Sequence, residues 1–316
     1  MSPSTQIVNR VLPVLFLLAL GYWLRRRNVL AATTMDDLRN IVVNLALPAV
    51  LFSSFLQIQF KSAYLVVFVL LYALCVGLFG LGRWLARRLR VEHPYFPFLM
   101  TGFEYGMLGI SLFGSAYGLE KIGYLAIVDL GHEIFIWSFF LVLLLLQRDG
   151  RQDPRRLLGS FLTSPVVIAI AAGIALNLLG ARAMLYDLPV TGAIMATLAF
   201  LGNLVIPLIL MIVGYGMKLD RSGLREAARV VLIRLAILVP LALALNTIVL
   251  RGLLGLEREF ELALFTLLVL PPPFIVPLYA RADMVAEKRY VNTVLTLYTV
   301  VSIGIFIAFF VASAWT

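Results

Sequence analysis

The segment from Phe98 to Gly118 (FLMTGFEYGMLGISLFGSAYG) most constrains what this chain can fold into. It is long enough to cross a membrane, because a spanning helix needs about 20 residues. Yet glycines stand at positions 102, 106, 109, 114 and 118, and a carboxylate, Glu104, lies near the middle. A continuous helix in lipid gains nothing from these glycines or from a charge. The segment therefore predicts a discontinuous helix that lines a polar cavity.

The rest of the chain has the composition of an integral membrane protein. Of its 316 residues, 62% are hydrophobic and 14% are charged, and the mean hydropathy is +0.98. Soluble domains are about 45–50% apolar and about 25% charged. The net charge of +9 lies in short clusters between apolar runs, which is typical of topology determinants and not of a nucleic-acid-binding surface. Clusters such as Arg25–Arg27 and Arg83–Arg90 are interpreted first as topology determinants, with contact to anionic membrane lipid as a second interpretation.

Few residues with metal or redox chemistry are present. Cys75 is the single cysteine, and His93 and His132 are the only histidines. An intramolecular disulfide and a cysteine-based metal cluster are therefore excluded. We predict no cofactor and no metal site.

Apolar segments predict ten membrane spans joined by short connections, at about 20 residues per crossing. The first, 7–24, is not expected to be a signal peptide, because arginines follow it and no small-x-small cleavage site is present. The predicted spans are 7–24, 38–58, 63–83, 95–117, 122–146, 161–180, 190–216, 229–250, 260–281 and 290–313.

The distribution of Lys and Arg predicts the orientation. Most of the 26 basic residues belong to the connections after the odd-numbered spans. The positive-inside rule then places both termini on the non-cytoplasmic side of the plasma membrane, which in a bacterium is the inner membrane. The basic residues assigned to the connections after the odd-numbered spans are Arg25–Arg27, Arg39, Arg83, Arg87, Arg88, Arg90, Arg148, Arg151, Arg155, Arg156, Lys218, Arg221, Arg225, Arg229, Arg234, Arg281, Lys288 and Arg289.

An internal repeat relates the two halves. The sequence Asn-Leu-x-x-Pro occurs at Asn44–Pro48 in the second span and at Asn203–Pro207 in the seventh. The same offset of five spans pairs the Phe98–Gly118 segment with the ninth span, which Pro271–Pro273 interrupts. Since five is odd, the halves 1–150 and 151–316 insert with opposite orientation. The sequence thus predicts an all-α polytopic protein built from two inverted five-helix repeats, with helices 4 and 9 broken near the bilayer midplane.

These pieces resemble the auxin efflux carrier family, which includes plant PIN-type exporters and bacterial carriers of organic anions, and which is related to the bile-acid/sodium symporters. The resemblance is carried by Asn44–Leu51 (NLALPAVL), Gly106–Ile110 (GMLGI) and the proline break of the ninth span. It implies a scaffold of helices 1, 2, 6 and 7 and a transport domain of helices 3–5 and 8–10. It further implies that the broken helices cross, that the transport domain moves as an elevator, and that the scaffolds form a homodimer. The chain departs from the family pattern at Glu104-Tyr105, where Asn-Thr is usual, and at Gly109-Ile110-Ser111, where Gly-x-Pro is usual.

Glu104 is the strongest candidate for a functional side chain. A carboxylate at this depth costs about 2.5–3.5 kcal/mol on insertion scales, so it is expected to face protein or water. We predict that it contacts substrate and carries a proton. The alternative is a structural acceptor that caps a half-helix.

The fifth span carries Asp129, His132 and Glu133, with spacings that place Asp129 beside the other two on one helical face. This group is predicted to couple transport to a proton or an ion. The competing interpretation is a mutually satisfied polar cluster that holds the span to its neighbours.

The remaining candidates surround the two breaks. Backbone N–H groups near Gly106 and after Pro272 and Pro273 are expected to attract a carboxylate. Tyr105 and Phe274 are candidates for stacking on the substrate or, alternatively, for packing. Asn44 and Asn203 are candidates for substrate contact or for structural kinks beside their prolines.

These features favour a secondary active carrier for a small organic anion, either coupled to protons or acting as a uniporter, and not an enzyme. One alternative is a sodium-coupled symporter of the bile-acid type. A second is a membrane sensor or scaffold that transports nothing. An intramembrane hydrolase using Ser111 and His132 is the least favoured, because the serine lacks a Gly-x-Ser-Gly setting.

Overall fold

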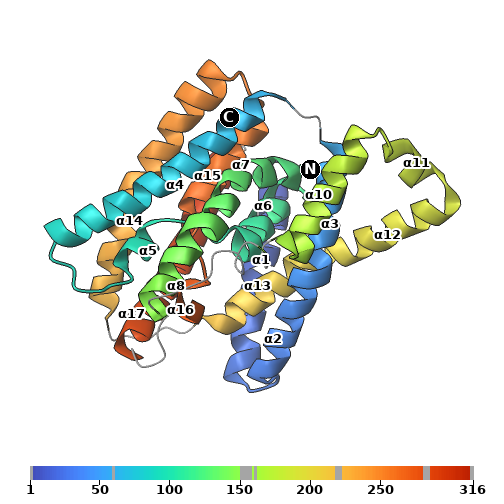
Figure 1. The fold of residues 1–316 in the computed structure, drawn as a ribbon. Helices are drawn as coiled ribbons and strands as arrows, with labels where there is room; N and C mark the ends of the chain where they lie inside the picture. Colours follow the sequence, from blue (N-terminus) through green and yellow to red (C-terminus); the bar gives the residue numbers. More distant parts are fainter. Residues whose placement is uncertain are drawn as a thin grey trace.

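The computed structural model describes residues 3–58, 61–149, 159, 162–217, 223–279 and 285–313, and every regular element in this part is a helix (Figure 1). The all-helical prediction is confirmed. A helix satisfies its own backbone hydrogen bonds, which lipid cannot do. Among these residues, seven helical segments are long and apolar enough to cross a membrane: Ala32–Gln57, Ala63–Arg88, Phe96–Tyr117, Leu119–Gln147, Pro189–Gly216, Leu224–Leu253 and Ala286–Ser313.

The three other predicted spans also contain helix. They hold α1 (Pro3–Arg26), α10 (Pro165–Leu178) and α15 (Arg258–Val269), the last followed by a break and the short α16 (Val276–Tyr279). A multi-pass membrane protein is thus confirmed, whereas the count of ten and the inverted repeat stay predictions. The two chain ends both lie toward the top of Figure 1.

Some sequence predictions fall outside the described residues. The boundary between the proposed halves, at 150 and 151, is one of them. So are six of the basic residues that indicated orientation: Arg151, Arg155, Arg156, Lys218, Arg221 and Arg281.

Prolines interrupt the second and seventh predicted spans at matching places. In the second, α2 (Ala32–Ile41) passes through a π-helical turn, η1 (Val42–Ala46), into α3 (Leu47–Gln57). In the seventh, α12 (Pro189–Asn203) and α13 (Val205–Gly216) are separated at Leu204. Each proline lacks the N–H that would bond the asparagine carbonyl four residues earlier, which accounts for an irregularity at each site.

Close contact between α1 and α13 depends on small residues. A Cβ atom added to Gly21 would lie 2.0 Å from the carbonyl oxygen of Met211, and one added to Gly214 would lie 2.1 Å from that of Leu18. Such small-residue contacts drive helix association in lipid, where no hydrophobic effect acts between helices. In the same part of the molecule α10 packs against α3, and α12 also contacts α3.

A second set of helices surrounds the broken ones. Here α4 (Ala63–Arg88) packs against α7 (Ile122–Phe135) and α5 (Phe96–Met100), and α7 also contacts α15. The chain continues from α7 through η4 (Ile136–Phe140) into α8 (Leu141–Asp149). Two long helices, α14 (Leu224–Ala244) and α17 (Val285–Ser313), pack against each other and complete the set.

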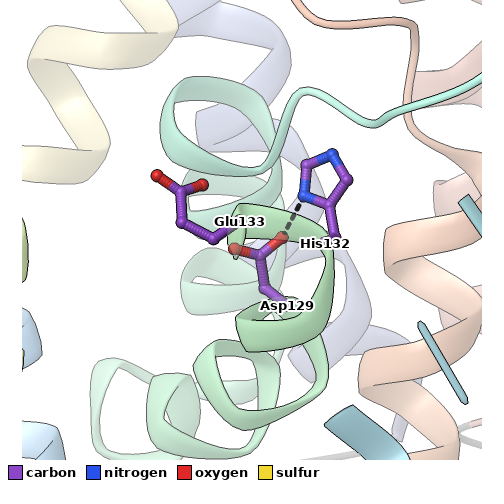
Figure 2. Close-up of side chains that lie close together, drawn as sticks. All are labelled: Asp129, His132 and Glu133. Carbon is purple, nitrogen blue, oxygen red and sulfur yellow. Dashed lines mark hydrogen bonds and ion pairs between the residues drawn. The ribbon is translucent and has the colours of Figure 1, made fainter. Parts of the chain in front are cut away.

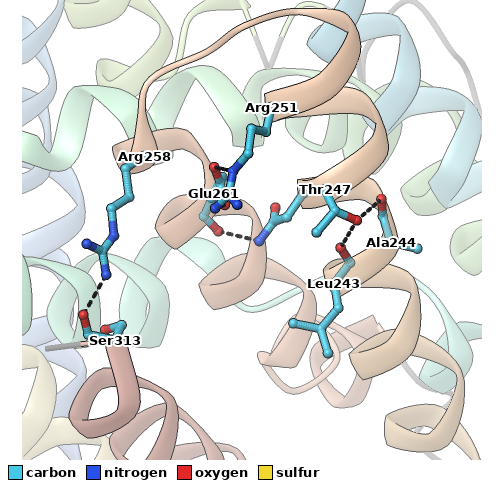
Figure 3. A network of polar contacts seen from close by, with 8 residues as sticks. Leu243, Ala244, Thr247, Arg251, Arg258, Glu261 and Ser313 are labelled. Atoms are coloured by element: carbon cyan, nitrogen blue, oxygen red, sulfur yellow. Dashed lines mark hydrogen bonds and ion pairs between the residues drawn. The ribbon is translucent and has the colours of Figure 1, made fainter. Parts of the chain in front are cut away.

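Polar contacts hold the start of α15 in place (Figure 3). Arg251, in the π-helical η5 (Leu245–Leu253), binds both carboxylate oxygens of Glu261 at 2.8 and 2.7 Å. Asn246 donates to the Glu261 carbonyl at 2.9 Å, and Arg258 donates to the carbonyl of Ser313 at 2.6 Å. These contacts join α15 to the ends of η5 and α17, so the direction of α15 toward its break is fixed.

The two breaks meet inside the molecule. The first separates α5 from η2 (Tyr105–Gly109), which leads into α6 (Ile110–Tyr117) and the short η3 (Leu119–Lys121). The second separates α15 from α16. The backbone N–H of Glu104 donates to the carbonyl of Pro271 at 2.8 Å. The unwound stretches therefore contact each other directly.

Gly102 makes this contact possible, and we predict that Gly102→Ala destabilises the protein. Its φ is +69°, and an added Cβ would lie 2.7 Å from Cγ of Pro273. The left-handed conformation alone costs a non-glycine residue about 1–2 kcal/mol. We expect the unfolding midpoint of the detergent-solubilised protein to fall by about 4 °C or more.

Gly106→Ala is the matched control, because no atom lies within 4 Å of a Cβ built at Gly106. This variant should keep the wild-type midpoint. Equal losses in the two variants, measured by thermal unfolding, would contradict the contact between the breaks.

Candidate substrate site at the helix crossing

A cavity of about 320 Å³ lies beside the place where the two breaks meet, which we call the helix crossing. Glu104 lines it together with Phe274 and Met107, which follow the two breaks. The opposite wall is formed by α13, and α2 contributes Arg39. Further polar groups come from one face of α17, namely Asn292, Thr296 and Thr299. The cavity is thus mostly apolar with a few convergent polar groups, as ligand sites usually are.

The Glu104 carboxylate bonds to both broken helices. One oxygen accepts from the N–H of Phe274 at 2.6 Å, and the other accepts from the N–H of Met107 at 3.3 Å. The N–H of Met107 lies in the first turn of η2, where the helix dipole is positive, and the N–H of Phe274 lies in the turn that precedes α16. The sequence predicted that these donors attract a carboxylate. In this structure the carboxylate on them is Glu104 itself, whose residue is only 8% exposed.

Arg234 bonds to the opposite, carbonyl-rich side of the crossing. Its Nη1 donates to the carbonyls of Leu99 at 2.7 Å and Thr101 at 3.3 Å. Its Nη2 donates to the carbonyl of Gly102 and, at 3.5 Å, to that of Leu270. The guanidinium therefore reaches the carbonyl ends of both α5 and α15.

This position corrects one sequence interpretation. Arg234 was assigned to the cytoplasmic connection after the seventh span, yet it lies within α14 and is completely buried. Arg225 and Arg229 also belong to α14, near its start, and both are exposed. Arg234 is therefore not a topology determinant.

His132, which Figure 2 shows bonded to Asp129, also bonds to the first break. Its Nε2 accepts from the N–H of Phe103 at 2.9 Å. Nε2 therefore carries no proton, and in a neutral imidazole the proton is on Nδ1. Nδ1 donates to Asp129 at 2.7 Å. Both nitrogens are thus occupied, which favours the structural interpretation of this pair over a proton relay.

Glu133 points away from the imidazole in Figure 2. Its carboxylate accepts from the indole N–H of Trp137 at 2.8 Å. One ligand atom from each of Asp129, His132 and Glu133 lies within 4.8 Å of the other two. Because two of the three residues already share a hydrogen bond, the group has the character of a polar cluster.

The structure brings only some predicted site residues together. Glu104 and Phe274 line the cavity, and Pro272 and Pro273 lie buried immediately before Phe274. Gly106 is partly exposed in η2, whereas the Tyr105 side chain is buried and does not line the cavity.

Asn44 and Asn203 are exposed and do not line this cavity. The Asn44 amide donates to the carbonyl of Asn40 in its own helix at 2.9 Å. This local bond favours the structural interpretation of the first Asn-Leu-x-x-Pro motif.

The sequence did not predict the polar side chains of α2 and α17 that line the cavity, or the buried position of Arg234. Arg39 was assigned to a connection, although it lies in α2 and faces the cavity. The signal for Arg234 was its setting, an arginine within the apolar run VVLIRLAIL. The rule that singled out Glu104 applies equally to this arginine.

Ser111 is occupied within its own helix. Its hydroxyl donates to the carbonyl of Met107 at 2.8 Å. Since both nitrogens of His132 also have other partners, the geometry offers no Ser–His pair for hydrolysis.

Comparison with known proteins identifies the class. A family described as Membrane transport protein matches residues 6–311. The chain therefore belongs to this family of membrane transport proteins, and the predicted membership of the auxin efflux carrier family is confirmed. No curated protein matches the chain.

The structural interpretation of His132 makes a prediction. In His132→Gln the amide oxygen can still accept from the Phe103 N–H, whereas in His132→Leu this buried donor has no partner. An unsatisfied buried donor costs about 1–3 kcal/mol, so the leucine variant should unfold at a clearly lower temperature than the glutamine variant. A proton relay would instead require a titratable group, and both variants would then lose proton-driven uptake while unfolding alike.

Proposed function

We propose that this protein is a proton-coupled secondary carrier of a small organic anion. The observation that carries the proposal is the carboxylate of Glu104, which lines the cavity and accepts N–H bonds from both broken helices. It occupies the kind of site that binds a substrate carboxylate in carriers with interrupted helices. The resident carboxylate and the substrate carboxylate thus compete for the same donors.

Protonation of Glu104 resolves this competition. An ionised Glu104 keeps the N–H groups of Phe274 and Met107 and repels an incoming anion. A protonated Glu104 loses its negative charge and the main reason for holding these donors, so a substrate carboxylate can take its place. One proton and one negative charge then move together, which lowers the cost of carrying a charge through the membrane.

The other cavity residues favour a small anion with an apolar part. Arg39 supplies a permanent positive charge, and Asn292, Thr296 and Thr299 supply hydrogen bonds. Met107, Ile212, Phe274 and Leu295 supply apolar surface. The volume of about 320 Å³ lies at the lower end of the range for small-molecule sites, about 300–1,000 Å³.

We further propose an inverted repeat with an elevator movement. The scaffold would comprise α1, α2–α3, α10 and α12–α13, and the transport domain would comprise α4–α8 and α14–α17. In support, α1 packs against α13 and α10 against α3, whereas α4 packs against α7 and α14 against α17. The cavity lies between the two groups, because α2 and α13 form one wall and Glu104 and α17 form the other.

A homodimer through the scaffold, in the plasma membrane with both termini outside the cytoplasm, completes the proposal. In support, α12 exposes apolar side chains, with Val190 and Phe200 each 74% exposed. The cavity is lined by Arg39, Gly216 and Met217, which lie next to the connections predicted to be cytoplasmic. We therefore assign this conformation to the inward-facing state.

Two alternatives are tested alongside. Sodium coupling predicts uptake that depends on a sodium gradient and not on a proton gradient. A sensor or scaffold predicts ligand binding without uptake. Thermal shift with a panel of mono- and dicarboxylic acids, followed by uptake into proteoliposomes under each gradient, separates the three.

Glu104→Gln is the decisive variant. With a substrate identified by that thermal-shift screen, wild-type proteoliposomes should accumulate it up to about tenfold per pH unit of inward proton gradient. One pH unit corresponds to about 1.4 kcal/mol of driving force. The glutamine amide can accept a hydrogen bond but does not titrate, so this variant should only equilibrate substrate.

Glu133→Gln is the matched control for that experiment. Glu133 does not line the cavity, so this variant should accumulate substrate as the wild type does. Full proton-driven accumulation by Glu104→Gln would disprove the proposed coupling. If only the Glu133 variant lost proton-driven accumulation, the coupling residue would be Glu133 in the fifth span and not Glu104.

A further inference from the structure

A helix that ends inside the membrane leaves carbonyl oxygens without partners and a partial negative charge. Here α5 ends at Met100 and α15 ends at Val269, and both ends point at the same place. In carriers with interrupted helices, unwound carbonyls and half-helix C-termini are the groups that coordinate sodium. The crossing therefore contains the oxygen atoms of a cation site.

Arg234 fills this place. It bonds to four carbonyls, those of Leu99, Thr101, Gly102 and Leu270, which come from both broken helices. Its guanidinium carbon also lies 5.1 Å from the ring centre of Phe103 and 5.3 Å from that of Tyr298. Aromatic faces stabilise a buried cation through their quadrupole.

Arg234 differs from the arginine of an ordinary buried ion pair in the groups that it contacts. Basic residues inside a membrane usually pair with carboxylates or backbone carbonyls. Within the described part of the chain, no carboxylate lies within ion-pair distance of Arg234. His132 is neutral because its Nε2 accepts a hydrogen bond. The hydrogen bonds of the guanidinium in the described part of the chain thus go to carbonyl oxygens, which receive a permanent positive charge as they would from a metal ion.

We infer that Arg234 is the resident cation of the helix crossing, a positioning residue that replaces a coupling metal ion at the carbonyl ends of both broken helices. Transport then needs no sodium, and removal of the guanidinium opens a site for a small cation. This inference rests on the proposed carrier function. It deepens that function by leaving the proton as the coupling ion.

The test uses the full-length protein in detergent and needs no substrate. We expect the wild-type unfolding midpoint to be the same in NaCl, KCl and choline chloride at equal ionic strength. Arg234→Ala should unfold about 10 °C lower in choline chloride, because breaking a buried charge site costs several kcal/mol. Addition of Na⁺, or of guanidinium at low millimolar concentration, should restore at least half of this loss, whereas choline is too large to enter.

Arg229→Ala is the matched control, since Arg229 lies in the same helix but is exposed. It should keep the wild-type midpoint and show no dependence on the cation. If Arg234→Ala does not fold, Arg234→Gln undergoes the same titration, because its amide keeps one donor for the carbonyls without the charge.

A sodium-dependent midpoint in the wild type would overturn the inference. So would a loss in the Arg234 variants that no small cation restores, because a merely structural side chain leaves no cation site when it is removed. Neither result bears on proton-driven uptake, and a failure of the Glu104→Gln prediction leaves the cation titration unaffected. The two proposals can therefore fail separately.

Discussion

The broken helices depend on partners for the backbone groups that they leave unpaired in a medium without water. Each unsatisfied group in lipid costs several kcal/mol, so a break persists only where protein supplies the missing bonds. Between Leu99 and Glu104 these bonds come from three distant elements. Arg234 on α14 donates to the carbonyls of Leu99 and Thr101, and His132 on α7 accepts from the N–H of Phe103. The carbonyl of Pro271 accepts from the N–H of Glu104. The rest of the architecture places these partners.

The partners divide by sign. The positive guanidinium of Arg234 lies at the helix ends where the dipole is negative, and the carboxylate of Glu104 lies at the start of η2, where the dipole is positive, and bonds to the turn before α16. They also differ in access, since Arg234 is completely buried whereas Glu104 lines the cavity. A group that holds the fold must not be displaced, and a group that exchanges with substrate must be reachable. Under the two proposals, Arg234 therefore has the permanent role and Glu104 the exchangeable role.

Local chemistry made the breaks predictable. Pro271–Pro273 cannot donate the bonds of a helix, and the glycines and Glu104 are out of place in a lipid-facing one, so both interruptions followed from residue types alone. The partners did not follow, because α7 and α14 meet the first break only in three dimensions. Arg234 resembled a topology determinant because it lies only five residues inside the predicted span. A count of basic residues does not distinguish such a buried charge from the loop charges that flank a span. Asn44 and Asn203 marked kinks, but the face toward which each side chain points depends on packing.

The two buried charges restrict what can cross with the substrate. If the carbonyl site is filled by an arginine that never leaves, a metal ion has nothing to bind at the crossing, and the only exchangeable charge there is on Glu104. A carboxylate alternates between one negative charge and none, so the substrate that replaces it is expected to be a monovalent anion at the point of contact. A second charge on the substrate would need Arg39, the one basic side chain among the described residues that line the cavity. The distance between Arg39 and the donors of Phe274 and Met107 then sets the length of any dicarboxylate that fits.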